Sequence, residues 1–424
     1  MGRSTETIID QVEKIFQCEK HEAELGVVDA MERMLINMVK NWPTFGDYLF
    51  SFIYDHTESL KKYESYDKVP FESIWKCITK SFKQNNMKGI GTINKNANTP
   101  LAVYHEKSKH FDKLCFNESR ESVFLFALGL RMTTDQVSEL LTKMLLQSDF
   151  DPKDPKEVII YWSLKSRNDQ DSPYTLMLKW EKEYERIRKG ISQYEINRYE
   201  KNDTDIIFKN QLLNIKDDTM FGNYLRTLVY NNNINRCRGK QRTIQEVFKG
   251  FVMDIQRINK LVQEDEYVYL GYEKLANWLV LYRREISEKY QGPILPDDVL
   301  KTLFSTGIGN RIISFKKDYI NDRINGNVTI SRKDILIAKA VVYFHEIKMD
   351  KEEGREYELS KNMLWVDFSK DVDGYFELCR MQPFYLRNPF EYFLVICLLQ
   401  NEPLDYFMAN WERALTWRRE VNGR

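Results

Sequence analysis

Two stretches that lie far apart in this chain share one pattern. Residues 154–164 read DPKEVIIYWSL, and residues 388–399 read NPFEYFLVICLL. Each begins with Asp or Asn, continues with Pro, places Glu two positions later and then becomes almost wholly apolar. Asp and Asn cap helix starts, Pro is tolerated at the first helical position, and Glu in the first turn favours the helix dipole. Both stretches therefore predict a helix with a sharply defined start.

The two predicted helices are apolar on every face, which favours burial inside a core. The residues before them match as well, because 137–150 and 372–385 each read as a short helix that stops before the cap. Each stretch therefore belongs to a unit that consists of a helix, a short loop and a buried helix. Either 137–164 and 372–399 are diverged copies of one unit, or both obey the same capping rules. In both cases the chain stacks helix pairs.

Helical signals continue through the rest of the chain. Thr133 precedes Gln136 by three residues, which is a capping-box spacing, and Ser331 begins a similar start at S-R-K-D. Strict alternation of apolar and polar residues is scarce, and 266–275 is the nearest strand candidate. The sequence predicts an all-α protein of stacked helix pairs, with a diverged internal repeat as one explanation of the shared pattern.

Composition bounds the class of protein. The chain has 424 residues, of which 42% are hydrophobic and 13% aromatic, so it has enough apolar surface for real cores. The polar stretch 199–205 is the best linker candidate, and it predicts two helical domains, 1–200 and 201–424. Lys plus Arg and Asp plus Glu are balanced at 63 each, so no overall field draws the chain to nucleic acid or acidic lipid.

One segment resembles a known family. Residues 119–141, SRESVFLFALGLRMTTDQVSELL, resemble the last two helices of Cro/repressor-type (lambda-repressor-like) helix-turn-helix domains. Residues 44–56 are similar to the first helix of such a domain. The resemblance covers 45–165, and it implies a regulator that binds DNA. The features that carry it are Arg120, Ala127, Leu128, Leu130, Thr133, Val137, Leu140 and Leu141.

The segment in the place of the DNA-reading helix departs from this family. In residues 71–83, FESIWKCITKSFK, one helical face is apolar and consists of Ile74, Trp75, Ile78 and Phe82. A DNA-reading helix instead exposes polar side chains to base edges. Residues 43–170 contain 18 Lys and Arg against 17 Asp and Glu, a net charge of only +1. Phosphate neutralisation requires a more basic domain. The resemblance therefore implies a degenerate helix-turn-helix.

Motifs for metal, cofactor or covalent chemistry are missing. His105 and His110 are five residues apart without further ligands nearby, and the GIG sequences at 89–91 and 307–309 lack the Lys-Ser/Thr of a phosphate loop. His345 is interpreted as an ordinary helix-end histidine. We assign no catalytic residue, no metal ligand and no cofactor. No two cysteines form a C-x-x-C pair, which favours reduced thiols over disulfides. The six cysteines are Cys18, Cys77, Cys115, Cys237, Cys379 and Cys397.

The best candidate for nucleic-acid contact is the basic stretch 234–242. It contains Arg236, Arg238, Lys240 and Arg242 in a predicted loop, with Tyr224, Arg226 and Tyr230 nearby. Cations beside aromatic rings hold single-stranded nucleic acid by charge and stacking. A solvated loop is the plainer interpretation. At the C-terminus, Trp411 and Leu415 share a helical face, which predicts docking onto the body or a partner.

The N-terminal residues are polar, and no run of about 18 apolar residues is present, so we expect no membrane span and a cytoplasmic protein. The stretches 331–346 and 381–399 resemble helical proteins of Gram-positive bacteria. These features leave three hypotheses. The first is a non-enzymatic helical interaction or regulatory protein that binds a protein partner. The others are a nucleic-acid-binding transcriptional regulator with a degenerate helix-turn-helix, and a phage-defence effector with dispersed catalytic residues.

Overall fold

A computed structural model gives the fold of the chain. It describes residues 21–41, 45–65, 68–87, 100–111, 120–166, 171–190, 205–235, 240–258, 272–305, 312–354 and 361–422. All regular elements in these ranges are helices, and no strand occurs among them. The predicted all-α class is confirmed. Of the strand candidate 266–275, the residues from Tyr272 onward are helical and the others lie outside the described ranges.

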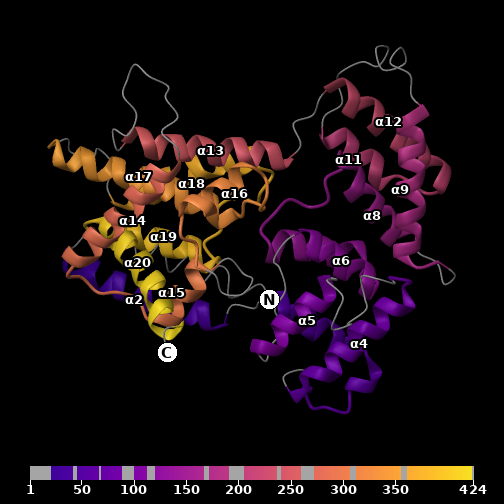
Figure 1. The fold of residues 1–424 in the computed structure, drawn as a ribbon, viewed down its shortest axis with the longest axis horizontal. Coiled ribbons are helices and arrows are strands. Elements are labelled where there is room, and N and C mark those ends of the chain that lie inside the picture. Colours follow the sequence, from indigo (N-terminus) through magenta and orange to yellow (C-terminus); the bar gives the residue numbers. More distant parts are fainter. Residues whose placement is uncertain are drawn as a thin grey trace. The chain divides into compact units, whose positions relative to one another are not determined.

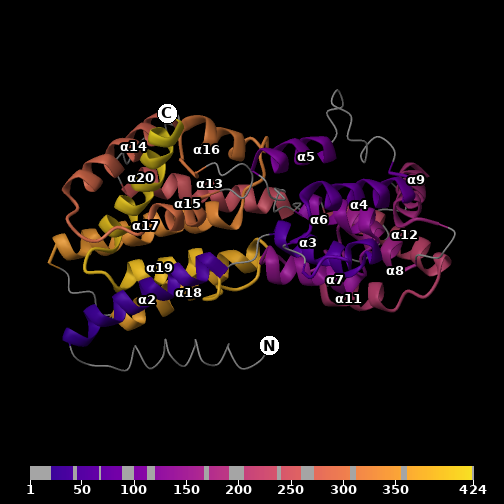
Figure 2. The ribbon, with the colours of Figure 1, turned by 90° about the horizontal axis from the view of Figure 1, so that it is seen from below.

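The helices form two compact units, each with its own core (Figures 1 and 2). Unit 2 contains the elements that run from residue 45 to residue 235. They are α3 (Phe45–Asp55), η1 (Glu58–Leu60), α4 (Phe71–Gln84), α5 (Pro100–Phe111), α6 (Arg120–Leu130), α7 (Thr134–Glu139), the π-helical turn η3 (Leu140–Met144), α8 (Pro155–Lys165), α9 (Pro173–Gly190), α11 (Asp205–Leu213) and α12 (Asp218–Asn235).

Unit 1 combines one N-terminal helix with the C-terminal part of the chain. Its elements are α2 (His21–Asn41), α13 (Lys240–Ile258), α14 (Tyr272–Lys289), α15 (Asp297–Phe304), α16 (Lys317–Ile324), α17 (Arg332–Glu352), α18 (Lys361–Leu378), α19 (Pro389–Leu399) and α20 (Pro403–Asn422). The α2 helix packs along α19, far from it in sequence (Figure 2).

The units do not divide at the predicted boundary between 1–200 and 201–424. Phe208 of α11 and Phe221 of α12 are buried in the core of unit 2, and Met31 of α2 is buried in the core of unit 1. The polar stretch near residue 200 therefore does not separate the two cores. A polar composition typical of linkers indicates a weakly packed segment. Which core the following helices join depends on where their apolar side chains are buried.

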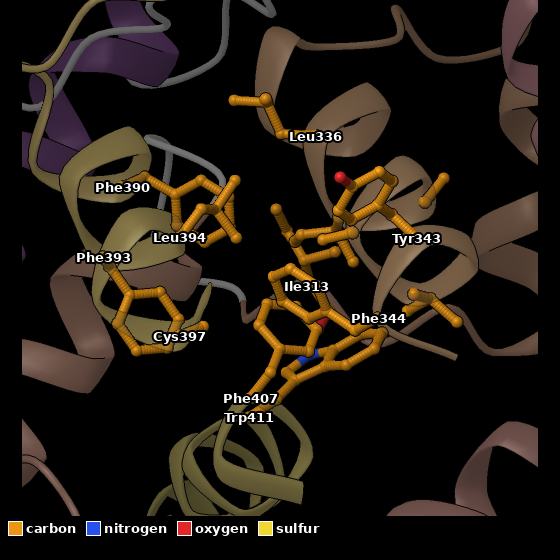
Figure 3. Packing of buried hydrophobic residues seen from close by; sticks show 14 of the residues in the cluster. Ile313, Leu336, Tyr343, Phe344, Phe390, Phe393, Leu394, Cys397, Phe407 and Trp411 are labelled. Atoms are coloured by element: carbon orange, nitrogen blue, oxygen red, sulfur yellow. The ribbon is translucent and has the colours of Figure 1, made fainter. Parts of the chain in front are cut away.

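The core of unit 1 is rich in aromatic rings. Phe304 of α15 lies between rings of α19 and α20, at 5.7 Å from Phe393 and 5.8 Å from Phe407. Trp411 of α20 packs in the same cluster, and its indole nitrogen donates to the carbonyl oxygen of Ile313 at 2.6 Å (Figure 3). The predicted docking of the C-terminal helix onto the body of the protein is thus observed for Trp411.

The two apolar helices begin as the sequence predicts. Asp154 accepts hydrogen bonds from the first-turn backbone of α8, and Asn388 does the same for α19, with Pro at the first helical position in both. Every residue of α19 is buried. The helices before them end earlier than predicted, at Met144 and Leu378, and an irregular segment follows each. The capping boxes at Thr133 and Ser331 are also present.

In unit 2 a buried arginine ties the start of α6 to the start of α8. Arg120 Nε donates to Glu157 Oε1 at 2.8 Å, and Arg120 Nη2 donates to Glu157 Oε2. The guanidinium also donates to the carbonyl oxygens of Ser148 and Asp149, at 2.6 and 3.1 Å. The backbone N–H of Asp151 donates to Glu157 Oε2 at 2.8 Å. We call this arrangement the unit 2 clamp.

Unit 1 contains the same arrangement at the start of α17 and α19. Arg332 Nε and Nη2 donate to the two carboxylate oxygens of Glu391, at 2.8 and 2.7 Å. The guanidinium also donates to the carbonyl oxygens of Gln382 and Pro383, at 2.5 and 2.9 Å. The backbone N–H of Tyr385 donates to Glu391 Oε2 at 2.6 Å. We call this arrangement the unit 1 clamp.

Close helix packing in unit 2 gives a testable prediction at Gly129 of α6. A Cβ atom at this position would lie 2.1 Å from the ring of Phe82 in α4. We expect Gly129→Ala to lower the free energy of unfolding by about 1–3 kcal/mol, because the packed ring must shift. Urea unfolding followed by circular dichroism measures the change.

The matched control is Gly222→Ala in α12, where a Cβ atom would meet nothing within 4 Å. This change should leave stability equal or raise it by about 0.5–1 kcal/mol, because alanine restricts the unfolded chain and favours the helix. Equal losses at Gly129 and Gly222 would contradict the close approach of α4 and α6.

Candidate functional site

The helices α8, α9 and α12 of unit 2 meet around one aromatic ring. Phe221 of α12 stacks on Trp162 of α8, with the ring centroids 5.1 Å apart, and meets the edge of Trp180 in α9 at 4.8 Å. The unit 2 clamp fixes the start of α8, and this helix then places the buried Trp162 and the exposed Lys165 next to α12. Two hollows open there.

The first hollow has a volume of about 540 Å³ and lies between the end of α8 and the turn that joins α11 to α12. The second has a volume of about 420 Å³ and lies between α9 and α12. Asp218, the first residue of α12, lines both. Its carboxylate accepts from Trp162 Nε1 and from Lys179 Nζ, each at 3.2 Å. These two contacts join the three helices at the boundary between the hollows.

Cationic side chains dominate the α9–α12 hollow. Lys179, Lys182, Arg186 and Arg226 line it together with two carboxylates, those of Glu183 and Asp218. Arg186 donates twice to Glu183, at 2.8 and 2.6 Å. These hydrogen bonds lower the pKa of the Glu183 carboxyl, and the positive charges of Arg186 and Arg226 add to the effect. The side chains that line the hollow therefore carry a net positive charge, which favours an anionic partner.

Apolar side chains are exposed around these hollows. Leu213, which lines the first hollow, is 51% exposed, and Met220 in the first turn of α12 is 42% exposed. Gly222 lines the α9–α12 hollow, and a side chain there would meet open space. Trp180 also lines this hollow, and its buried indole nitrogen has no hydrogen-bond acceptor among the described residues. A buried indole N–H normally has one.

The described structure does not show the side chains of the predicted nucleic-acid residues. Arg236 and Arg238 lie outside the described residues, whereas Lys240 and Arg242 belong to the first turn of α13, with side chains that are not described. The basic stretch is therefore not one loop, because α13 begins at Lys240. The prediction that these four residues contact nucleic acid remains a prediction.

Two neighbours of this stretch have clear positions. Tyr224 is buried, and its hydroxyl donates to the carbonyl oxygen of Pro152 at 2.6 Å. Burial also raises the pKa of Tyr224 above its ordinary value. The predicted stacking of this ring on a base is thus incompatible with its position in the core. Arg226 instead lines the α9–α12 hollow.

The histidines do not form a metal site in the described part of the chain, which contains no group of metal-ligating side chains. The ring of His105 packs against Phe71 and the edge of Trp75, with ring centroids 6.2 and 5.0 Å apart. His110 has a side chain that is not described. Of the cysteines, Cys379 and Cys397 are buried and Cys77 is half-buried.

The segment 71–83, which the sequence resemblance sets against a DNA-reading helix, forms most of α4. Its apolar face is buried as predicted, with Ile74, Trp75, Ile78 and Phe82 in the core. The opposite face exposes Lys76, Lys80 and Lys83. The exposed lysine face was not predicted. The spacing of four and three residues between these lysines was the available signal, because it places all three on one side of a helix.

Comparison with known proteins gives no relative. The chain matches no family model, no curated protein and no solved structure. In the part of the chain that the structure describes, no helix is both long and apolar enough to cross a bilayer.

A pH-dependent stability is expected from His345 in α17. The imidazole is buried, and its Nδ1 has no hydrogen bond among the described residues. Burial lowers the pKa of His345, the charge of Lys348 lowers it further, and Glu352 acts against them. The unfolded chain therefore binds this proton more readily than the folded chain. Stability is fully present above about pH 6.5 and falls as the pH drops through the lowered pKa.

Urea unfolding at pH 7.5 and pH 5.5 measures this difference. The variant His345→Gln should show a smaller loss of unfolding free energy between the two pH values than the native chain. The matched control is His56→Gln, which replaces an exposed histidine. An unchanged slope in His345→Gln would assign the acid sensitivity to other groups.

Proposed function

We propose that this chain is a non-enzymatic cytoplasmic protein that binds a protein partner on the surface of unit 2 formed by α8, α9 and α12. One observation carries the proposal: two adjoining hollows share Asp218 and combine exposed apolar side chains with a positive surplus. Surfaces that combine an apolar centre with a charged border are typical of protein interfaces.

Two buried charged pairs have a structural role. Arg120 and Glu157, like Arg332 and Glu391, bind each other and the backbone at helix starts. These groups hold the fold together and leave the chemistry of recognition to the surface. The hollows are lined by long, flexible cations, which suit a partner with matching charges better than the positioning of a reaction.

The proposal predicts that filling the α9–α12 hollow prevents binding. A peptide-display selection on the purified full chain supplies binders, and fluorescence anisotropy measures their affinities. Gly222→Trp places a large side chain where the structure has open space. We expect this variant to weaken the selected peptides at least tenfold.

The matched control is Gly250→Trp in α13, where a side chain also meets open space and which lines neither hollow. It should leave the affinities unchanged. A selection that enriches no peptide sensitive to Gly222→Trp would reject the proposed surface.

The lysine face of α4 favours a second candidate function, contact with nucleic acid. Lys76, Lys80 and Lys83 are exposed on one side of the helix, opposite the buried Trp75. Such a row places cations within reach of successive phosphates without reading bases. It agrees with the alternative in which a degenerate helix-turn-helix domain contacts the nucleic-acid backbone.

This second candidate predicts weak, salt-dependent binding to duplex DNA. The triple variant K76E/K80E/K83E should abolish binding, and the salt slope of the native chain should be roughly 0.9 per phosphate contact. The control K62E/K68E/K143E changes the same total charge at exposed lysines elsewhere in unit 2. Mobility shifts at low ionic strength that do not distinguish the two variants would remove this candidate.

A further inference from the structure

The clamps of unit 1 and unit 2 agree beyond their shared cap. Counted back from Glu157 and from Glu391, the two carbonyl acceptors lie nine and eight residues earlier, and the N–H donor lies six residues earlier. A residue with positive φ, which is uncommon outside glycine, precedes each Glu by eleven positions. These residues are Leu146, with φ of 50°, and Arg380, with φ of 52°. The segment before the buried helix therefore makes the same contacts in both units.

Capping rules do not account for this agreement. They explain why Asp or Asn, Pro and Glu begin a helix, but they do not place an arginine from another helix on the same two carbonyl groups. That arginine is the first residue of its own helix in both units, Arg120 of α6 and Arg332 of α17. The two units therefore contain corresponding helices, with α6 and α8 of unit 2 in the places of α17 and α19 of unit 1.

The helix after each clamp has a matching sequence. Residues 177–182 of α9 read MLKWEK, and residues 408–413 of α20 read MANWER. The Met and the Trp of both segments are buried. Trp180 thus corresponds to Trp411, and each is followed by a glutamate and then by a cation. The α9 helix therefore corresponds to α20, in the register that these two tryptophans set.

A further helix packs beside α9 and α20 in the same way. Asp218, the first residue of α12, accepts a hydrogen bond from Lys179 of α9 at 3.2 Å. Asp297, the first residue of α15, accepts two hydrogen bonds from Arg413 of α20, at 2.8 and 2.7 Å. The α12 helix of unit 2 thus takes the place of α15 in unit 1.

One helix of unit 1 has no counterpart around α9. The α20 helix packs mainly against α14, α15, α17 and α19. The α9 helix packs mainly against α6, α8 and α12, which correspond to α17, α19 and α15. Among the helices that the structure describes in unit 2, none takes on α9 the place that α14 takes on α20.

In unit 1 the α14 helix brings cations to one flank of α20. Arg283 Nε donates to Glu412 Oε2 at 3.3 Å, and Arg284 Nε lies 3.7 Å from Glu412 Oε1. Glu412 is only 4% exposed, and Ala409, one turn earlier in α20, is fully buried. A buried carboxylate requires such partners, because an unpaired buried charge is costly.

The corresponding flank of α9 is accessible. Leu178, in the place of Ala409, is 39% exposed. Glu181, in the place of Glu412, is partly buried and forms no ion pair with another described residue. Neither residue lines the hollow between α9 and α12. We call this surface, formed by Leu178 and Glu181, the α9 flank.

The ring of Trp180 is not part of the α9 flank, because it is buried. Lys179 Nζ lies 5.2 Å from the centre of this ring, much as the guanidinium of Arg283 lies 4.3 Å from the centre of the Trp411 ring. In unit 2 the cation over the tryptophan therefore comes from α9 itself. A helix that docks on the α9 flank needs to supply only the cation for Glu181.

We infer that the α9 flank is a docking site for an arginine-bearing amphipathic helix of a partner protein, in the place that α14 takes on α20. The arginine pairs with Glu181, as Arg283 pairs with Glu412, and the apolar face of the helix covers Leu178. Amphipathic helices that lay one face on a partner are a common mode of recognition. The site lies outside the two hollows, so it goes beyond the proposed function.

A synthetic peptide with the native sequence of α14, residues 272–289, is the probe. Its control has Arg283 and Arg284 replaced by Glu. Fluorescence anisotropy measures the affinity of each labelled peptide for the full chain. We expect the native peptide to bind about tenfold more tightly than its control, and this preference to shrink at high salt, because exposed charges are screened.

Charge exchange on α9 locates the bound peptide. Glu181→Lys should weaken the native peptide about tenfold and strengthen the control peptide. The matched variant is Glu183→Lys, which makes the same charge change on the flank of α9 that faces α12, where Glu183 pairs with Arg186. This variant should leave the preference for the native peptide in place. Equal affinities of the two peptides, or equal effects of the two variants, would overturn the inference.

The outcomes of the two proposals are separable. Gly222→Trp fills the α9–α12 hollow and should leave the α14 peptide unaffected, because the α9 flank does not line that hollow. If Gly222→Trp weakens the display peptides while Glu181→Lys leaves the α14 peptide unchanged, the hollow is supported and the α9 flank is rejected. The reverse result rejects the hollow and supports the α9 flank.

A second copy of the chain is the competing occupant of the α9 flank. Analytical ultracentrifugation of the native chain and of Glu181→Lys tests for it. A monomer in both cases supports a helix from a partner protein. Self-association that Glu181→Lys removes would assign the α9 flank to a second copy and overturn the inference.

Discussion

The buried ion pair between an arginine at one helix start and a glutamate at the next is the interaction on which both units depend. A buried pair of this kind rarely adds net stability relative to apolar residues, but removal of one partner costs about 3–5 kcal/mol. Burial raises the pKa of the Glu391 carboxyl, and Arg332 acts against this effect. The additional contacts to backbone groups fix an irregular segment that has no helical hydrogen bonds of its own.

These clamps connect the fold to the candidate surface. In unit 2 the clamp fixes the start of α8, and α8 and α9 hold Phe221 of α12 between two tryptophan rings. In unit 1 the corresponding surface of α20 is covered by α14 and α15, so its charges are already paired. The two units share their interior contacts and differ in what lies on the outer helix. The proposed protein-binding surface is the outer face of α8, α9 and α12 in unit 2.

Helix starts were predictable because their causes are local. The caps at Asp154 and Asn388 follow from side-chain reach within one turn, and α8 and α19 begin and end as their apolar runs predict. The lysine face of α4 follows from the spacing of Lys76, Lys80 and Lys83, which places them on one side of a helix. The candidate hollow was not predictable, since Lys182 and Arg226 lie on different helices. Only the packing of α9 against α12 brings them together.

The sequence by itself determined the all-α class and which helices are buried. It also determined the residues at which α8 and α19 begin, because capping and periodicity act over a few residues. The tertiary structure alone decided that helices 205–235 join unit 2, that Tyr224 is buried, and that Arg120 and Arg332 reach distant glutamates. These contacts connect residues that are far apart in the chain. Their geometry depends on how whole helices pack, which no local pattern records.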